Sequence, residues 1–312
     1  TLVFYAPHHI GPGNSAGNPA YIDRFSDLTS GVSELRDHIR RHHAGLPVIL
    51  IGHSMGGLIA IRLALGAHAD YAGLILTGPL LGQPEAPSRL QVMLIRVLSV
   101  VAPKVKAIEI DASAVSRDPA VVSDYIADPL VHHDNIPARM VVSLFDETAQ
   151  VMKEASSLQL PVLLLHGAED KLTSVTASEA FFEKLGSSDK KITVYDGVFH
   201  ELFNEPEQDS ILQTCSEWIN ARLDGHEAYV SGPYLVAFDR VEAQSLKVHL
   251  NIAYRHQPKM SVIQQLGHLD PPTTEIALHV GAIDSQPIVP PRIQHYLAGL
   301  DVRCAIAPGS DL

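Results

Sequence analysis

The residues best suited to chemistry lie in Gly52-His53-Ser54-Met55-Gly56, a Gly-x-Ser-x-Gly pentapeptide. It follows the apolar run 47–51 and precedes the apolar, helix-periodic segment 58–65, so the sequence predicts a strand, a sharp turn and a helix. Such a turn exposes the serine hydroxyl at the carboxyl end of the strand, and its glycines let strand and helix approach closely. The pattern therefore indicates a nucleophilic Ser54, with the Met55 N–H as a donor to an oxyanion. An ordinary glycine-rich loop is the alternative for so short a pattern.

A serine hydroxyl is a weak nucleophile at neutral pH, so it needs a histidine as base and a carboxylate behind that histidine. Asp170 and His200 each lie in a loop that follows a predicted strand. Parallel strands bring such loops to one edge of the sheet, where Ser54 is also expected. Glu169 competes with Asp170 as the acid. We favour Asp170 because a loop one residue longer lets the carboxylate turn back to the histidine. With either acid, the chain order serine, acid, histidine is that of α/β hydrolases.

The chain contains 17 histidines, so position decides their interpretation. We expect His8, His9, His132 and His133, like the histidines of the C-terminal part, to be surface or loop residues. His53, beside the serine, is expected to pack behind the nucleophile or to support the site, not to act as the base. No cluster has the ligand spacing of a zinc or calcium site, and no glycine-rich loop suits a dinucleotide. We therefore expect no metal and no cofactor.

The segments around these residues alternate between strand and helix patterns. Strands are predicted at 2–6, 48–51, 73–77, 161–166 and 191–195, and helices at 23–43, 58–65, 90–101, 138–155, 174–185 and 207–223. Asp23 is expected to cap the first helix, and Gly45 to follow its end. The alternation predicts the α/β-hydrolase fold, a mostly parallel sheet flanked by helices.

Residues from about 78 to 159 interrupt the alternation with two strongly apolar helices, 90–101 and 138–155. One interpretation makes them core helices. We favour a cap inserted over the active-site edge of the sheet, whose inner face would meet an apolar substrate.

The character of the chain changes again after Gly225. Residues 225–312 include the pairs Pro271-Pro272 and Pro290-Pro291, and the alternation within 230–256 would suit a pair of strands. We cannot assign this part to the sheet. The predicted organisation is thus a hydrolase domain of residues 1–224 and a C-terminal extension, 225–312, of unknown fold and role.

Composition excludes some classes of protein. A formal net charge of −12 argues against nucleic acid as a partner, because phosphate binding needs clustered Lys and Arg. The two cysteines are far apart and indicate a reducing compartment, so a cytoplasmic location is expected. No apolar run approaches the length of a transmembrane helix, about 18 residues or more, and no signal peptide is in view. The chain enters a predicted strand directly after Thr1, so its beginning looks cut off.

Three segments resemble the monoacylglycerol lipase family: Gly52 to Gly57, the Leu-His-Gly-Ala-Glu-Asp-Lys loop at 165–171, and Tyr-Asp-Gly-Val-Phe-His-Glu-Leu at 195–202. The segments 115–119 and 125–131 of the inserted region are similar to the family as well. The resemblance covers roughly residues 2–223. It implies an α/β hydrolase that cleaves a monoacylglycerol into glycerol and a fatty acid.

The same resemblance implies roles for individual residues. Ser54 would be the nucleophile, His200 the base and Asp170 its partner, with Tyr125 near the alcohol end of the substrate. The family pattern differs at both ends. Its His-Gly-x-Gly loop, which supplies a second oxyanion donor, precedes the position of Leu2, and its members have no counterpart of residues 225–312. Its Asp-His-x-Gly-His-Gly turn appears here as His-His-Ile-Gly-Pro-Gly at 8–13.

The sequence thus predicts a serine carboxylester hydrolase for monoacylglycerols or similar lipid esters. A lysophospholipase, or another small-ester or thioester hydrolase with the same triad, is one alternative. A catalytically inactive lipid-binding protein is another, from a different class. Peripheral membrane contact through the cap is a further expectation, and the oligomeric state is open.

Overall fold

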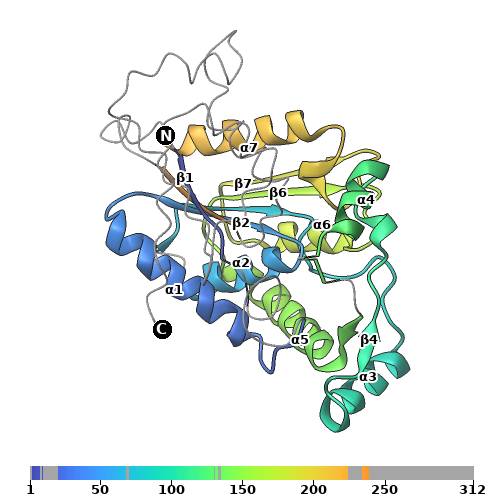
Figure 1. Ribbon diagram of the computed structural model, residues 1–312. Coiled ribbons are helices and arrows are strands. Elements are labelled where there is room, and N and C mark those ends of the chain that lie inside the picture. Colours follow the sequence, from blue (N-terminus) through green and yellow to red (C-terminus); the bar gives the residue numbers. More distant parts are fainter. Residues whose placement is uncertain are drawn as a thin grey trace.

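In a computed structural model of the chain, residues 2–7, 9, 20–67, 70–129, 131–132, 135–223 and 234–238 are described. Within them lies a six-stranded sheet of order β1-β8-β2-β3-β6-β7, in which every neighbouring pair is parallel (Figure 1). The strands are β1 (Leu2–Tyr5), β2 (Val48–His53), β3 (Gly73–Thr77), β6 (Val162–Gly167), β7 (Lys190–Tyr195) and β8 (Tyr234–Phe238). Because the strands are parallel, their carboxyl ends meet at one edge, which is where the predicted site residues lie.

Both faces of the sheet are covered by helices, as a parallel sheet requires. In Figure 1, α7 (Gln208–Leu223) lies on one face, and α1 (Ser26–His42), α2 (Met55–Gly66) and α6 (Val175–Lys184) lie on the other. Alternate strand residues point to opposite faces. In β2, Leu50 packs into the cluster of α1 and α2, whereas Ile49 and Ile51 pack against Trp218 of α7.

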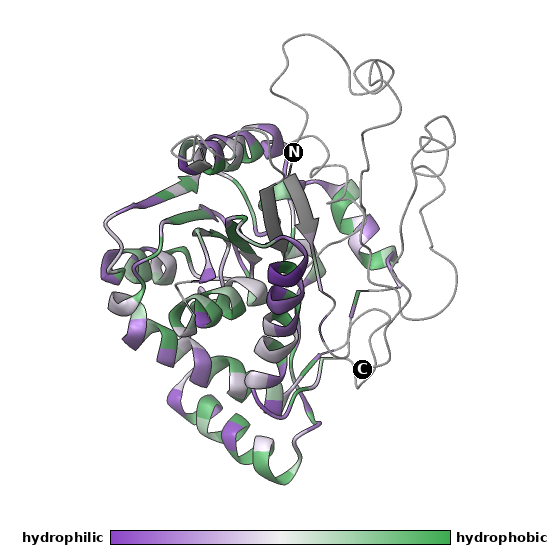
Figure 2. Cartoon of the chain, turned by 90° about the vertical axis from the view of Figure 1, so that its left-hand side faces the viewer, coloured by the Kyte–Doolittle hydropathy of each residue, from purple (hydrophilic) through white to green (hydrophobic). Residues whose placement is uncertain are grey.

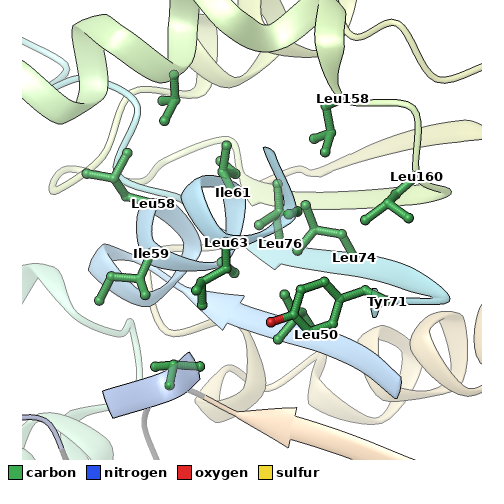
Figure 3. Close-up of a cluster of buried hydrophobic side chains, with 14 of the residues drawn as sticks. Leu50, Leu58, Ile59, Ile61, Leu63, Tyr71, Leu74, Leu76, Leu158 and Leu160 are labelled. Carbon is green, nitrogen blue, oxygen red and sulfur yellow. The ribbon is translucent and has the colours of Figure 1, made fainter. Parts of the chain in front are cut away.

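The larger cluster joins the sheet to α2. Figure 3 shows Leu58, Ile61 and Leu63 of α2 lying over Leu74 and Leu76 of β3. All of α2 from Gly56 to Ile61 is buried, so the helix is held between the sheet and the outer helices. Burying a leucine or isoleucine side chain contributes about 1.5–3 kcal/mol, so this packing fixes the start of α2, and with it Ser54.

The first helix begins differently from the prediction. Asp23 does not cap it: the helix starts at Ser26, and Phe25 stands at the N-cap without a side-chain hydrogen bond. Instead, the carboxylate of Asp27 accepts hydrogen bonds from the backbone N–H groups of Asp23 and Arg24. These bonds tie the preceding chain to the first turn, where a carboxylate is also favoured by the helix dipole. The N–H groups of Asp27 and Leu28 in the first turn donate instead to the carbonyls of Arg24 and Phe25. Gly45 follows the end of the helix with φ +83°, as expected.

The segment between β3 and β6 contains more elements than the sequence predicts. Besides α3 (Arg89–Val101) and α5 (Ala138–Glu154), it holds the short antiparallel strands β4 (Lys106–Ile108) and β5 (Ile136–Pro137), a 3₁₀ turn at Ala112–Ala114, and α4 (Pro119–Ala127). The two predicted helices differ in kind. Met140, Leu144 and Val151 of α5 join the main core, so α5 is a core helix. In α3 only Ser99 is buried. Three of its apolar side chains are half-buried, and the other six are exposed: Leu90, Met93, Leu94, Val97, Val100 and Val101.

The backbone of β8 belongs to the sheet, although we could not assign any part of residues 225–312 to it from the sequence. Tyr234–Phe238 lies between β1 and β2, in parallel with both, and Phe238 stands opposite Ile51. The division of the chain at residue 224 stays a prediction. The loop at 8–17, apart from His9, and the rest of the extension lie outside the described residues.

Candidate active site

Ser54 occupies a strained turn between β2 and α2. Its φ is +54° and its ψ −120°, which few non-glycine residues adopt. The turn is held on both sides, because the Ser54 N–H donates to the carbonyl of Thr77 (3.0 Å) and the Ser54 carbonyl accepts from the N–H of Leu80 (2.9 Å). A Cβ on Gly52 would lie 2.5 Å from the carbonyl oxygen of Gly56, and one on Gly57 would lie 2.8 Å from Pro79. Both glycines are therefore required by close approach.

Met55 is the first residue of α2. The first N–H groups of a helix have no partner within it, and the helix dipole places partial positive charge there. The backbone at Ser54–Met55 is thus arranged to stabilise negative charge beside the serine hydroxyl. The role of the Met55 N–H as oxyanion donor stays a prediction.

Asp170 and His200 are joined directly. Oδ2 of Asp170 lies 2.7 Å from Nδ1 of His200, and both side chains are almost completely buried. The neighbouring Glu169 is exposed to solvent. Of the two acids considered from the sequence, Asp170 is therefore the one that faces the histidine.

The carboxylate of Asp170 is surrounded by donors. The backbone N–H groups of Leu172 and Thr173 donate to Oδ1, and the Thr173 hydroxyl donates to Oδ2. Nε2 of His166 lies 3.2 Å from Oδ2. Burial by itself would raise the pKa of Asp170, but the hydrogen bonds from His166 and His200 outweigh it and lower the pKa well below its usual range. Asp170 is a fixed anion.

The anionic Asp170 determines which nitrogen of His200 carries the hydrogen. A carboxylate that cannot donate requires a hydrogen on Nδ1 of His200, so Nε2 is left as the acceptor. Burial lowers the pKa of His200, which the hydrogen bond to Asp170 partly offsets. Gly78, with φ +48°, lies so close that a Cβ there would be 3.2 Å from Nδ1 of His200. The ring is thus closely confined, and its lowered pKa favours the neutral form.

The residue next to Ser54, His53, contacts the Asp170–His200 pair. The ring of His53 lies against that of His200, with 4.6 Å between their centroids. The hydrogen bonds of His200 within the described residues run to Asp170 and Thr173 and not to Ser54. Bonds between nucleophile and base are often long in free enzymes and tighten when substrate binds. Ser54 follows β2, whereas Asp170 and His200 lie in the loops after β6 and β7. All three predicted residues thus lie at the carboxyl edge of the sheet.

Sequence reasoning missed three residues of this site. His166, in β6, is fully buried and bridges Asp170 to the hydroxyl of Ser178, which lies 2.9 Å from its Nδ1. Thr173 contacts both Asp170 and His200. Glu201 faces His53. The position of His166 four residues before Asp170 is the only sequence signal, and many histidines have a carboxylate at that spacing.

Tyr125 lies in the inserted segment, on α4. It is buried in a small cluster with Val115 and Val131, and Leu172 packs against that cluster. Since Leu172 follows Asp170 by two residues, the cluster borders the acid's loop. A role of Tyr125 at the alcohol end of a substrate stays a prediction.

An ion pair fastens the inserted segment to the histidine's loop. The carboxylate of Glu205 is fully buried, and it accepts from the backbone N–H of Arg117 (2.8 Å) and from its Nε (2.6 Å). Arg117 also pairs with Glu207, whose side chain is 41% exposed. The buried carboxylate thus links residues 88 positions apart in the chain.

We expect Glu205→Gln to lower the free energy of unfolding by about 2–4 kcal/mol, because it removes the charge that compensates a partly buried guanidinium. Glu207→Gln is the matched control, and loss of its exposed pair should cost less than about 1 kcal/mol. Urea unfolding of both variants measures the two values. Equal costs would show that the pair with Glu205 does not hold the segment in place.

The described residues contain no group of three or more histidine, cysteine or acidic side chains that could hold a metal ion. Within the same residues, no helix is both long and apolar enough to cross a membrane.

Comparisons with known proteins show which family the chain resembles. The family described as "Serine aminopeptidase, S33" (Hydrolase_4) matches residues 2–207. Over 222 residues the chain is 35% identical to a monoacylglycerol lipase of Mycolicibacterium smegmatis, covering 71% of this chain and 79% of that protein. It is 32% identical over 224 residues to the monoglyceride lipase of Homo sapiens, covering 71% and 74%.

A solved structure is similar as well. The crystal structure of a monoacylglycerol lipase from Paleococcus ferrophilus superimposes with a TM-score of 0.62 at 29% identity, covering 68% of this chain and 81% of that one.

Proposed function

Because the chain belongs to the serine aminopeptidase S33 family and is a carboxylic ester hydrolase of the monoacylglycerol lipase type, we propose that Ser54, His200 and Asp170 are its catalytic triad. The family and the α/β-hydrolase fold predicted from the sequence are confirmed. The enzyme cleaves monoacylglycerols or similar lipid esters into fatty acid and alcohol. The observation that supports the triad is the buried 2.7 Å hydrogen bond between Asp170 and His200, beside the strained turn of Ser54.

The proposed reaction follows from the protonation state of His200. Its Nε2 takes the proton of the Ser54 hydroxyl as Oγ attacks the ester carbonyl, and the Met55 N–H donates to the oxygen that becomes negative. The same Nε2 then gives its proton to the leaving alcohol, which departs. Water, deprotonated by Nε2 of His200, then attacks the acyl-enzyme. The bond between the acyl carbon and Ser54 Oγ breaks, His200 returns the proton to Oγ, and the fatty acid is released. Asp170 remains an anion throughout and stabilises the imidazolium.

The substrate class is tested by competition. The purified full chain is given equal concentrations of a monoacylglycerol and a lysophosphatidylcholine with the same acyl chain, and released glycerol and glycerophosphocholine are measured. We expect glycerol release to dominate. Dominant release of glycerophosphocholine would favour the lysophospholipase alternative, and folded protein that releases neither and gives no burst with a chromogenic ester would be a lipid-binding protein.

We also propose that α3 rests on a lipid surface. Leu90, Met93, Leu94, Val97 and Val101 recur at spacings of three and four, and each is between 52% and 72% exposed. Figure 2 shows green, hydrophobic stretches on the helix at the bottom of the molecule. The acyl chain of the substrate is itself apolar, so an exposed apolar helix in the segment between β3 and β6 suits reversible binding to the lipid phase that holds the substrate. The proposal places the enzyme in the cytoplasm with peripheral membrane contact.

Replacing both Leu94 and Val97 by Gln should reduce binding to phosphatidylcholine vesicles by at least about tenfold. Each side chain contributes about 1.5–3 kcal/mol when fully buried, so half-burial of the two would contribute about 1.5–3 kcal/mol together. Hydrolysis of a short, soluble ester should keep its wild-type kcat/KM. Vesicle sedimentation measures the binding. Arg89→Gln, on the same helix, is the control, because uncharged lipid should not respond to its loss. If the double variant sedimented with vesicles as wild type does, α3 would not be the part of the enzyme that contacts lipid.

A further inference from the structure

His53 and Glu201 face each other beside the site, and each is the sequence neighbour of a proposed catalytic residue. Nε2 of His53 lies 3.3 Å from Oε1 of Glu201, an ion-pair distance, and the two side chains are only 14% and 12% exposed. His53 ends β2, whereas Glu201 follows the loop after β7. β3 and β6 separate these strands in the sheet. The pair therefore connects the nucleophile's strand to the histidine's loop directly.

The contacts of His53 indicate its charge. Nδ1 lies 3.0 Å from the carbonyl oxygen of Thr77, which can only accept a hydrogen bond, so Nδ1 carries a hydrogen. The hydroxyl of Thr77, also 3.0 Å away, can accept as well. Nε2 lies at ion-pair distance from a carboxylate oxygen, although the contact is not a hydrogen bond. A carboxylate this close favours the protonated ring, so we assign His53 as an imidazolium with Glu201 as its counter-ion.

This cation touches the proposed base. The rings of His53 and His200 lie 4.6 Å apart, at an angle of 50°. Protonation of His200 would place a second positive charge at that distance, so His53 disfavours it and Glu201 compensates. His200 thus has two neighbouring charged groups. Asp170 is hydrogen-bonded to its Nδ1, and His53, paired with Glu201, lies against its ring.

The charged groups around His200 shift its pKa in opposite directions. Burial is the largest cause that lowers the pKa of His200; the hydrogen bond to Asp170 raises it, the charge of His53 lowers it, and that of Glu201 raises it. His166 acts only through Asp170, which it contacts from β6. The charge of His53 therefore lowers the pKa of His200, and that of Glu201 raises it.

We propose that His53 and Glu201 form a charged pair that positions the ring of His200 for proton transfer with Ser54 and balances the electrostatic field at that ring. This proposal rests on the proposed function, in which His200 is the base. The two side chains are positioning residues, which act on the reaction through the ring of His200. Opposite effects of the two charges distinguish the pair from ordinary packing.

The test is the pH dependence of kcat/KM for a soluble chromogenic ester, measured on full-chain wild type, His53→Gln, Glu201→Gln and the double variant. The acid limb of this profile reports the base in the free enzyme. His53→Gln leaves Glu201 uncompensated, so the limb should move to higher pH by about half a unit or more. Glu201→Gln should move it to lower pH, and the double variant should return it towards the wild-type position.

The plateau rate gives a second readout. A displaced ring should lower kcat by about tenfold in each single variant with little change in KM, because substrate binding does not use the pair. The double variant should lose no more kcat than the less active single variant, since each substitution already disrupts the same His53–Glu201 pair. Shifts of the same sign in the two single variants, or wild-type profiles and rates in both, would overturn the proposal.

Two controls separate this outcome from others. His42→Gln changes an exposed histidine of α1 that contacts the carbonyl of His38, and it should leave the profile unchanged. Thermal unfolding of every variant identifies any loss of folded protein. If folded wild type neither hydrolyses the ester nor reacts with a serine-directed probe, the proposed function itself fails, which is distinct from failure of the pair.

Discussion

Asp170→Asn should lower kcat by about 10⁴-fold while KM for a soluble ester stays close to the wild-type value. The carboxylate accepts hydrogen bonds from four groups besides His200: two backbone N–H groups, the Thr173 hydroxyl and His166. An asparagine has a single acceptor oxygen, and its NH₂ group would donate to Nδ1 of His200. That contact fixes the wrong tautomer, with hydrogen on Nε2, so the ring could not accept the serine proton.

Glu169→Gln is the matched control for this variant. Its side chain is exposed and one residue away, so activity should remain within about twofold of wild type, as for most surface substitutions. Steady-state kinetics on both variants decide between the two acids that the sequence offers. If Glu169→Gln were the inactive variant, the loop would have to rearrange in the working enzyme.

Ser54→Ala should lower kcat by about 10⁴ to 10⁶, because the acyl-enzyme can no longer form. Alanine adopts the turn at φ +54° no less easily than serine, so the fold should persist. Glycerol release from a monoacylglycerol measures the loss. Ser30→Ala, which changes an exposed hydroxyl of α1 bonded to the carbonyl of Asp27, should behave as wild type. Residual activity above about 1% in Ser54→Ala would remove Ser54 as the nucleophile, since loss of a triad residue costs far more.

The parts of the site that the sequence predicts are those that local rules determine. The turn at Gly52–Gly56 is recognisable because a strand, two close glycines and a helix follow one another without a gap. Asp170 and His200 are predictable because each lies in the loop that follows a strand of a parallel sheet, and parallel strands bring such loops together.

The contacts that sequence does not predict join residues far apart in the chain. The pairing of His53 with Glu201, and that of Arg117 with Glu205, depend on how loops of different elements meet, which no spacing encodes. Periodicity also finds an apolar face without saying what covers it. It predicts both α3 and α5, yet only α5 joins the core, because α3 packs on the outer side of α5. The strand β8 lies within the segment 230–256, whose alternation suits strands, but its place between β1 and β2 cannot be predicted because both neighbours are far from it in the chain.

The most direct test of the account is to map the site that reacts with a fluorophosphonate. The full chain is incubated with the probe at neutral pH, digested, and its peptides are analysed by mass spectrometry, with Ser54→Ala alongside. We predict a single covalent adduct, on Ser54, and none in Ser54→Ala, because only a serine activated by a neutral histidine reacts at this pH. An adduct on another residue, or no adduct on folded wild-type protein, would contradict the assignment of Ser54, His200 and Asp170 as the catalytic triad.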